Sequence, residues 1–172
     1  GFWEEQRSSV LDLIHSLFNV NPNAHLYIRL HPNLSRKPVE LELWKIFGNI
    51  YSDKVSLIMP DSSTDSYELA AYVDINFIFH SSIGAELMCM GKPIFAFNSC
   101  RFDYLYGCTI VNNTSHLIEI LNQGKSINSS FNHELVKKSG LEYLYSAMNF
   151  GFKHMLYESQ GPNRGTFLGV HL

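Results

Sequence analysis

Two periods of hydrophobic residues alternate along this chain. Short runs that are apolar at nearly every position have the length of buried strands, and longer stretches with an apolar residue every three or four positions are typical of one helix face. The predicted strands span residues 25–30, 55–59, 75–79, 93–97 and 108–111. The predicted helices span residues 4–18, 38–47, 65–73, 83–90, 114–122 and 134–157. The alternation predicts an α/β fold, with one parallel sheet of about five or six strands and helices on both faces.

Changes in composition divide the chain into three parts. Residues 1–125 hold the alternating strands and helices and form the predicted α/β domain. Residues 126–158 are predicted to form a long helical extension that packs on the same domain, with kinks at Gly140 and Gly151. Residues 159–172 are rich in glycine and are predicted to be an irregular tail.

Polar residues stand at the end of the most apolar predicted strand. His80, Ser81 and Ser82 follow this strand directly and precede a helix that Gly91 is expected to end. The first N–H groups of a helix have no partner within it, and the helix dipole favours negative charge there. The pattern therefore predicts an anion-binding site at this helix N-terminus. The alternative is that one of the two serines only caps the helix.

Composition narrows the class of ligand. The 172 residues are 45% hydrophobic, enough for the core of one globular domain, and a net charge of −3 gives no general footprint for nucleic acid. No apolar run reaches the length of about 18 residues that a transmembrane helix requires, and no signal sequence is evident, so we expect a cytoplasmic protein.

The chain opens on Gly1 rather than methionine, which suggests a piece of a longer protein.

The cysteines and histidines indicate neither a disulfide framework nor a metal site. Cys89, Cys100 and Cys108 are odd in number and lack the spacing of a zinc site, so we expect free thiols. The eight histidines are scattered without ligand spacing. The sequence also lacks the glycine-rich signatures of dinucleotide and P-loop sites, the nucleophile elbow of α/β-hydrolases and the HExxH helix. These absences remove support from the corresponding enzyme classes.

The loop after the first strand carries the first candidate residues. Loops at the carboxyl ends of parallel strands are where such sheets bind ligands. Arg29 and His31 are two residues apart, so a regular strand places them on one face, and Pro32 holds His31 in an extended conformation. An arginine beside a histidine suits a phosphate group. The alternative is a histidine that only closes the end of the strand.

The second and third loops complete the predicted site. Ser66 and Tyr67 begin the helix at 65–73, close enough to the crevice to touch a base or a ribose, although this loop is explained as well by helix capping. Gly84 is expected to let the backbone approach a ligand closely. Glu86 lies about one turn into its helix. It is either a solvated surface carboxylate or a partner for two neutral hydroxyls, such as those of a ribose.

Taken in order, these motifs resemble the C-terminal half of GT-B type glycosyltransferases. They are R-x-HP at 29–32, D-S-Y at 65–67, a serine pair at 81–82, and E-L-M-C-M-G-K-P at 86–93. His31-Pro32 and Ser81-Ser82 are similar to the HP and SS motifs of CMP-sugar-dependent Kdo transferases and sialyltransferases of capsule and lipopolysaccharide synthesis. The run from Glu86 is similar to the E-A-x-x-x-G-x-P element of retaining GT-B enzymes, with a leucine in place of the alanine.

The resemblance covers about residues 4–125 and implies a Rossmann-like domain that binds a nucleotide-activated sugar, with a CMP- or CDP-activated donor. It implies that Arg29 and His31 stabilise the leaving phosphate and that no metal or other cofactor is required. The residues implied in holding the donor nucleotide are Pro32, Ser66, Tyr67, Ser81, Ser82, Gly84 and Glu86. An N-terminal GT-B domain, absent from this chain, is implied as the source of the catalytic base, the acceptor site and any peripheral contact with the inner face of the membrane.

Three alternatives stay open. CDP-glycerol glycerophosphotransferases carry a similar R-x-HP pattern. UDP-sugar 2-epimerases share the architecture and place serine, glycine and glutamate at the same helix. A non-catalytic scaffold is expected to have a crevice plugged by side chains, with Arg29 and His31 paired to protein carboxylates.

Overall fold

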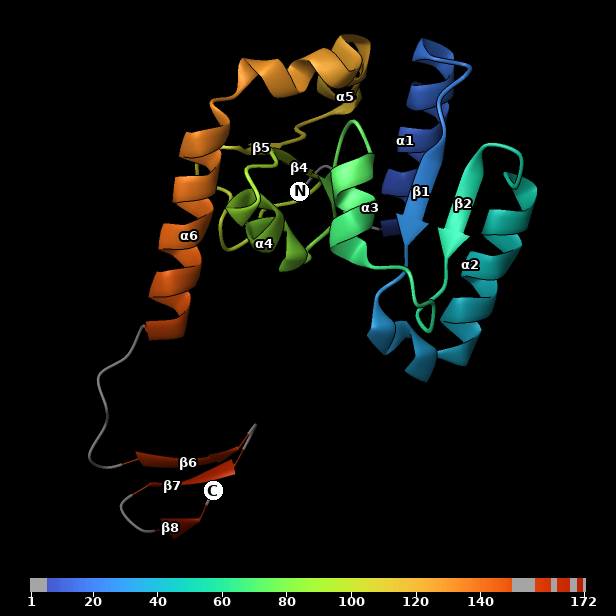
Figure 1. The fold of residues 1–172 in the computed structure, drawn as a ribbon. Coiled ribbons are helices and arrows are strands. Elements are labelled where there is room, and N and C mark those ends of the chain that lie inside the picture. The colour runs from blue at the N-terminus through green and yellow to red at the C-terminus, as the bar shows by residue number, and fades with distance from the viewer. Residues whose placement is uncertain (1–5, 150–156, 162–163, 168–169, 172) are drawn as a thin grey trace.

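The computed structural model describes residues 6–149, 157–161, 164–167 and 170–171, and it confirms the α/β class (Figure 1). The helices are α1 (Gln6–Val20), α2 (Pro38–Ile50), α3 (Ser66–Tyr72), α4 (Ile83–Cys89), α5 (Thr114–Gln123) and α6 (His133–Asn149). The 3-10 helices are η1 (Pro32–Arg36) and η2 (Gly124–Ser130). The strands are β1 (Leu26–Arg29), β2 (Val55–Ile58), β3 (Phe77–Ile78), β4 (Ile94–Ala96), β5 (Cys108–Ile110), β6 (Tyr157–Gly161), β7 (Arg164–Phe167) and β8 (Val170–His171).

The first five strands form two parallel sheets, so the prediction of one continuous sheet of five or six strands is corrected. One sheet is the pair β1-β2, and the other has the order β3-β4-β5. All three pairings among these strands are parallel, as predicted. Strands β1 and β3 each pair on one side only, which leaves an edge of each sheet without a strand partner.

Strand β3, at the edge of the larger sheet, is shorter than predicted. The predicted strand began at residue 75, but β3 begins at Phe77. The Asn76 side-chain amide donates to the Ala70 carbonyl at 3.2 Å, and the Asn128 amide donates to the Asp74 carbonyl at 2.6 Å. These side-chain bonds hold the chain before β3 against α3 and η2.

Strand β4 lies at the centre of the larger sheet and faces two hydrophobic clusters. Phe95 packs with Leu13 of α1 and with Leu117 of α5 on one face. Ile94 and Ala96, on either side of Phe95 in the sequence, pack with residues of α4 and α6 on the other face. Because alternate residues of a strand point to opposite faces, this burial confirms helices on both faces of the β3-β4-β5 sheet.

Helix ends follow local rules that the sequence contains. Asp65 caps α3 by accepting hydrogen bonds from the Tyr67 and Glu68 N–H groups at 2.6 and 3.1 Å, so this loop does serve to cap the helix, as one interpretation of the sequence expected. Gly91 has a φ of 74° after α4, and its N–H donates to the Met88 carbonyl while the next N–H donates to the Leu87 carbonyl. This is a Schellman motif, for which glycine is the preferred residue.

The prediction that α2 ends before Gly48 is wrong. The helix continues to Ile50, and Gly48 is buried inside it. A Cβ atom at Gly48 would lie 3.1 Å from the Leu57 side chain. The glycine therefore serves the close packing of α2 on β2 rather than helix termination.

The C-terminal part also departs from the prediction. The polar segment after α5 forms the helix η2. Helix α6 is described as far as Asn149, and Tyr157 begins β6, so the predicted helix end at 157 is wrong. The tail expected to be irregular contains the antiparallel strands β6, β7 and β8. Gly161 and Gly165 lie within β6 and β7, so these glycines do not prevent strand formation here. The predicted kink at Gly151 lies outside the described residues.

Gly140 brings α6 close to α4. A Cβ atom at this position would lie 2.7 Å from the Cys89 nitrogen and 2.8 Å from the Met88 carbonyl carbon. The absence of a side chain lets the two helix backbones approach, and Val136 of α6 is fully buried nearby in the same cluster. Within the described part of the chain, none of the helices has the length and apolar character needed to cross a membrane.

Candidate functional site

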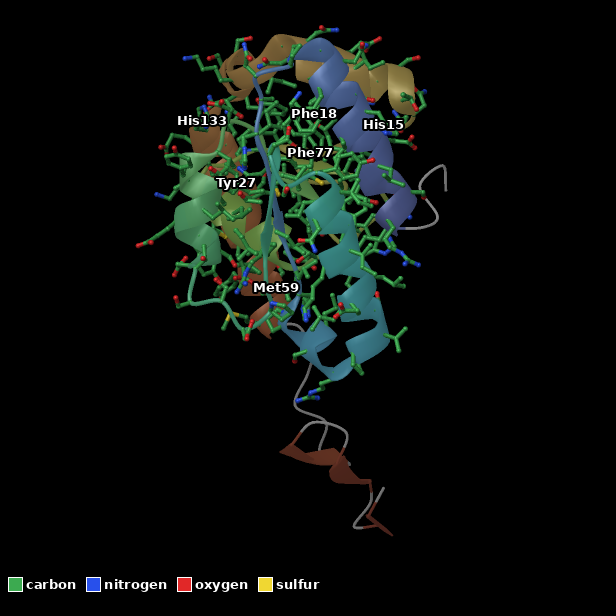
Figure 2. All side chains as sticks on the ribbon, turned by 90° about the vertical axis from the view of Figure 1, so that its right-hand side faces the viewer. His15, Phe18, Tyr27, Met59, Phe77 and His133 are labelled. Atoms are coloured by element: carbon green, nitrogen blue, oxygen red, sulfur yellow. The ribbon has the colours of Figure 1, made fainter. Side chains whose placement is uncertain are left out.

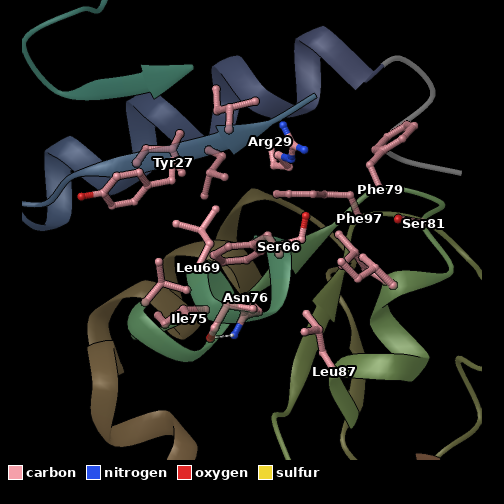
Figure 3. A pocket seen from close by; sticks show the side chains of 18 of the residues that line it. Tyr27, Arg29, Ser66, Leu69, Ile75, Asn76, Phe79, Ser81, Leu87 and Phe97 are labelled. Carbon is pink, nitrogen blue, oxygen red and sulfur yellow. Dashed lines mark hydrogen bonds between the residues drawn. The ribbon is translucent and has the colours of Figure 1, made fainter. Parts of the chain in front are cut away.

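A cleft of about 2050 Å³ separates the unpaired edges of β1 and β3 (Figure 3). Its walls come from α1, β1, α3, β3 and the start of α4. Eight of the nine residues predicted to bind the donor line this one cleft. They are Arg29, His31, Pro32, Ser66, Tyr67, Ser81, Ser82 and Glu86.

Arg29 is the last residue of β1 and holds the loop that follows β2. Its guanidinium donates one hydrogen bond to the Met59 carbonyl and another, of 3.3 Å, to the Ser62 carbonyl. A guanidinium has five N–H donors, so these two bonds fix its position and leave donors for a ligand. The group is partly buried, which strengthens its interaction with an anion.

His31 caps the short helix η1. Its φ and ψ of −66° and 137° are extended, as expected before proline, and its Nδ1 accepts a hydrogen bond of 3.1 Å from the Asn33 N–H. A neutral imidazole that accepts at Nδ1 carries its proton on Nε2. The exposed His31 ring therefore presents an N–H donor in addition to closing the strand end.

Tyr67 and Glu86 meet across the mouth of the cleft. The Tyr67 hydroxyl donates a hydrogen bond to Glu86 Oε2, which joins the first turns of α3 and α4. This hydrogen bond and the negative charge of Glu86 raise the pKa of Tyr67. Glu86 is therefore a half-buried carboxylate that lines the cleft and accepts a hydrogen bond from a neighbouring helix.

The turn before α4 keeps most of its N–H groups within the chain. The Gly84 and Ala85 N–H groups donate to the Ser81 and Ser82 carbonyls at 3.3 and 3.1 Å. Ser82 is the N-cap residue of α4, but its hydroxyl makes no capping hydrogen bond. The prediction of several free N–H groups at this N-terminus is thus corrected, and the serine hydroxyls remain as the polar groups that line the cleft.

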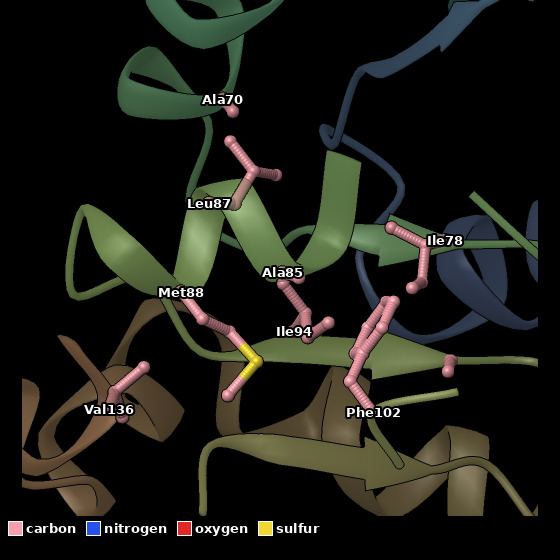
Figure 4. Packing of buried hydrophobic residues seen from close by; sticks show 9 residues of the cluster. Ala70, Ile78, Ala85, Leu87, Met88, Ile94, Phe102 and Val136 are labelled. Atoms are coloured by element: carbon pink, nitrogen blue, oxygen red, sulfur yellow. The ribbon is translucent and has the colours of Figure 1, made fainter. Parts of the chain in front are cut away.

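Gly84 is the predicted residue that the cleft does not include. Its hydrogen faces the core, where a Cβ atom would lie 2.7 Å from both Ile78 Cδ1 and Ile94 Cδ1 and 2.9 Å from Phe102 Cζ. Figure 4 shows these three side chains gathered beside α4. Glycine is therefore required at position 84 by close packing against the core, and not by the close approach to a ligand that we expected.

Phe79 is a cleft residue that the sequence prediction missed. It belongs to the predicted buried strand at 75–79, but it is only half-buried and lines the cleft beside Ser81 (Figure 3). Its ring lies 4.8 Å from the His80 ring, and His80 has a positive φ of 52°. An aromatic residue in the last position of an apolar strand, directly before polar residues, is the signal that could have found it.

The three cysteines form no disulfide with one another, and Cys100 lines the cleft. All three are free, and burial is the main cause that raises the pKa of Cys108. A hydrogen bond between the Cys100 and Cys108 thiols joins the loop after β4 to β5. Of the residues that the structure describes, no group of three or more histidine, cysteine, aspartate or glutamate side chains is arranged to hold a metal ion.

Comparison with protein-family models, with curated proteins and with solved structures found no match to this chain.

Proposed function

We propose that the cleft between β1 and β3 binds a nucleotide, and that the chain is the donor-binding domain of a GT-B type glycosyltransferase. The observation that carries the proposal is the convergence of three loops on one cleft. Eight residues chosen from the sequence for nucleotide binding line it together, although they lie as far apart as Arg29 and Glu86. Such a crevice beyond the carboxyl ends of parallel strands is where α/β sheets bind ligands.

The phosphate would lie at the end of β1. The Arg29 guanidinium and the His31 N–H supply donors, and the Ser81 and Ser82 hydroxyls line the facing wall. As the sugar leaves, negative charge grows on the phosphate, and fixed donors aimed at that charge lower the barrier. Arg29 is held by two main-chain carbonyls, so little reorganisation is needed.

The ribose and base would lie toward α3 and α4. The Glu86 carboxylate can accept hydrogen bonds from two ribose hydroxyls, in which case Tyr67 must release it. The half-exposed Phe79 ring offers a face on which a base can stack. In this proposal the Tyr67 hydroxyl is hydrogen-bonded to the Glu86 carboxylate in the absence of nucleotide, and the ribose hydroxyls replace it on binding.

The proposed reaction is sugar transfer in the synthesis of bacterial surface polysaccharide on the cytoplasmic side of the membrane, from a CMP- or CDP-activated donor. A separate N-terminal domain would supply the catalytic base and the acceptor site, so the isolated chain would bind the nucleotide and transfer nothing. Two observations argue against the scaffold alternative: Arg29 contacts main-chain carbonyls rather than carboxylates, and the cleft is open.

Calorimetric titration of the chain with CMP, CDP and UDP tests the proposal. We expect tighter binding of the cytidine nucleotides, and a loss of about tenfold or more in affinity in His31→Ala, because a charge-assisted contact is removed. His15→Ala is the matched control, because His15 lies on α1 away from the cleft lining. Failure of all three nucleotides to bind, or equal affinity in the two histidine variants, would refute the proposal. A preference for UDP would favour the 2-epimerase alternative.

The ribose contact has its own test. Glu86→Gln should lose the discrimination between CMP and its 2′-deoxy analogue, because a carboxylamide accepts hydrogen bonds from the ribose more weakly than a carboxylate does. Tyr67→Phe should bind CMP at least as tightly as the original chain, because Glu86 no longer has a competing partner. Glu119→Gln on α5 is the control for loss of a surface carboxylate. Unchanged discrimination in Glu86→Gln would remove Glu86 from the proposed site.

A further inference from the structure

A fourth loop reaches the cleft, from the carboxyl end of β4. Ser99, Cys100 and Arg101 of this loop line the cleft, although the sequence prediction included only the loops after the first three strands. The loop follows a parallel strand at its carboxyl end, which is where such sheets bind ligands. Its most informative residue is Arg101, because it adds a second guanidinium to a cleft that already contains Arg29.

The loop after β4 is packed against the first turn of α4. Phe102, which directly follows Arg101, is buried, and its Cζ would lie 2.9 Å from a Cβ atom at Gly84 (Figure 4). Ser81 and Ser82 precede this turn and line the cleft, as Arg101 does. The exposed Arg101 side chain therefore belongs to the same wall of the cleft as the serine pair.

Arg29 and His31 provide donors from the other wall. Figure 2 shows Met59, whose carbonyl accepts a hydrogen bond from the Arg29 guanidinium, at the carboxyl end of the β1-β2 wall. In Figure 3, Arg29 on β1 and Ser81 before α4 lie toward the same end of the cleft. His80 also lines the cleft, next to the serine pair. Each wall thus offers one guanidinium and one imidazole.

Neither guanidinium of the cleft is neutralised by a carboxylate within the described part of the chain. The ion pairs found there all join a lysine to a glutamate. Arg29 donates to main-chain carbonyls, which carry no net charge. Asp103 is the acidic residue nearest to Arg101 in the sequence, but its carboxylate accepts a hydrogen bond from the Ser99 hydroxyl of its own loop. Two uncompensated guanidinium groups favour an anion with more than one negative charge.

We propose that Arg101 and His80 form a second phosphate subsite, and that the ligand of the cleft is a nucleoside diphosphate rather than a monophosphate. This inference rests on the proposed function, because it assumes that the cleft binds a nucleotide. One phosphate group lies against Arg29 and the other against Arg101. A guanidinium can donate two parallel hydrogen bonds to one phosphate group, so each arginine suits one of the two. A monophosphate would leave one arginine without a partner.

Calorimetric titration with CMP and CDP tests the second subsite. We expect the original chain to bind CDP about tenfold or more tightly than CMP, because the second phosphate gains charge-assisted hydrogen bonds. Arg101→Gln should weaken CDP binding by about tenfold and change CMP binding by less than about threefold. Arg101→Lys should recover only part of the loss, because an ammonium group lacks the planar fork of a guanidinium. His80→Ala should act in the same direction by a smaller factor.

Lys125→Gln is the matched control. Lys125 is also an exposed cation that lines the cleft, so its loss changes the net charge by the same amount. It belongs to η2, and the Asn128 amide of η2 donates to the Asp74 carbonyl before β3. Lys125 therefore lies toward the amino end of β3, whereas Arg101 follows the carboxyl end of β4. We expect Lys125→Gln to keep the preference for CDP, and circular dichroism checks that each variant is folded.

The outcomes separate the second subsite from nucleotide binding itself. Equal affinity of the original chain for CMP and CDP would refute the second subsite and leave the proposed function in place. An equal loss of both nucleotides in Arg101→Gln would also refute it, and so would the same loss of preference in Lys125→Gln. Failure of both nucleotides to bind the original chain would refute the proposed function and the second subsite together.

Discussion

The two walls of the cleft differ in how completely they are packed. The β3-β4-β5 wall is buried on both faces by helices, and every residue of β4 lies in the core. The β1-β2 wall is less completely packed. Three of the four residues in each of these strands are only half-buried, and Tyr27 of β1 is exposed. Most of the buried apolar contacts that stabilise the fold therefore lie in the β3-β4-β5 wall. The candidate ligand groups of Arg29 and His31 come from the less buried β1-β2 wall.

Removal of a core side chain from the thicker wall should have the largest effect. Phe95→Ala deletes a fully buried ring of β4 and should lower the free energy of unfolding by about 3–5 kcal/mol. Ile28→Ala, in the half-buried part of β1, should cost less than half of this. Urea denaturation measures both values. Equal losses in the two variants would contradict the difference between the walls.

A methyl group between α4 and α6 should have the next largest effect. Alanine is the better helix former by about 1 kcal/mol, yet Gly140→Ala should destabilise the fold by about 1–3 kcal/mol because its Cβ meets the backbone of α4. Thermal unfolding followed by circular dichroism measures the change. Lys137→Ala, on the exposed side of α6, is the control and should leave the melting temperature nearly unchanged. A more stable Gly140→Ala protein would show that the two helices are not in close contact.

Loss of the α3 cap should lower the free energy of unfolding by a smaller amount, and it should also affect the cleft residue Tyr67. Asp65→Ala removes the acceptor for two N–H groups and should cost about 1 kcal/mol, measured by chemical denaturation. Asp65→Asn should retain nearly all of the stability, since asparagine caps about as well. If the cap also positions Tyr67, nucleotide affinity falls in the alanine variant and is kept in the asparagine variant.

The smallest effect concerns the protonation of Tyr67. The hydrogen bond to Glu86 raises the pKa of Tyr67, so this bond contributes stability that is present below the ordinary tyrosine pKa of about 10 and is lost as the pH rises through the raised value. Ultraviolet titration of tyrosinate, taken as the difference between the original chain and Tyr67→Phe, isolates this group. Glu86→Gln should return its pKa toward the ordinary value. An unchanged titration would show that the two side chains do not meet in solution.

The sequence predicted the order and type of nearly every element up to α5, because strand runs and helix periods are local patterns. It also predicted the three loops that meet at the cleft, since parallel strands carry their carboxyl ends to one edge. The division into two sheets could not be predicted, because strand runs show which segments are strands and not which strands pair with each other. The contact between Tyr67 and Glu86 was equally out of reach, although each residue had been selected separately.

The burial of Gly84 in the core shows a second reason why part of the candidate site could not be predicted from the sequence. A glycine beside a serine pair satisfies the expectation of a ligand site and the need for packing equally well, and only the positions of Ile78, Ile94 and Phe102 decide between them. The tail was misjudged for a related reason, because strands as short as β8 leave almost no periodic signal.

The unpaired edges of β1 and β3 have a calorimetric consequence. Leu17, Phe77 and Phe79 are only partly buried beside the cleft, so part of their apolar surface is in contact with water. Any ligand that drew the two sheets together would remove that surface from water and so produce a negative change in heat capacity on binding. A ligand that only filled the polar end of the cleft, at Arg29 and His31, would bind with almost no such change. The temperature dependence of the binding enthalpy thus reports whether the two sheets close on their ligand.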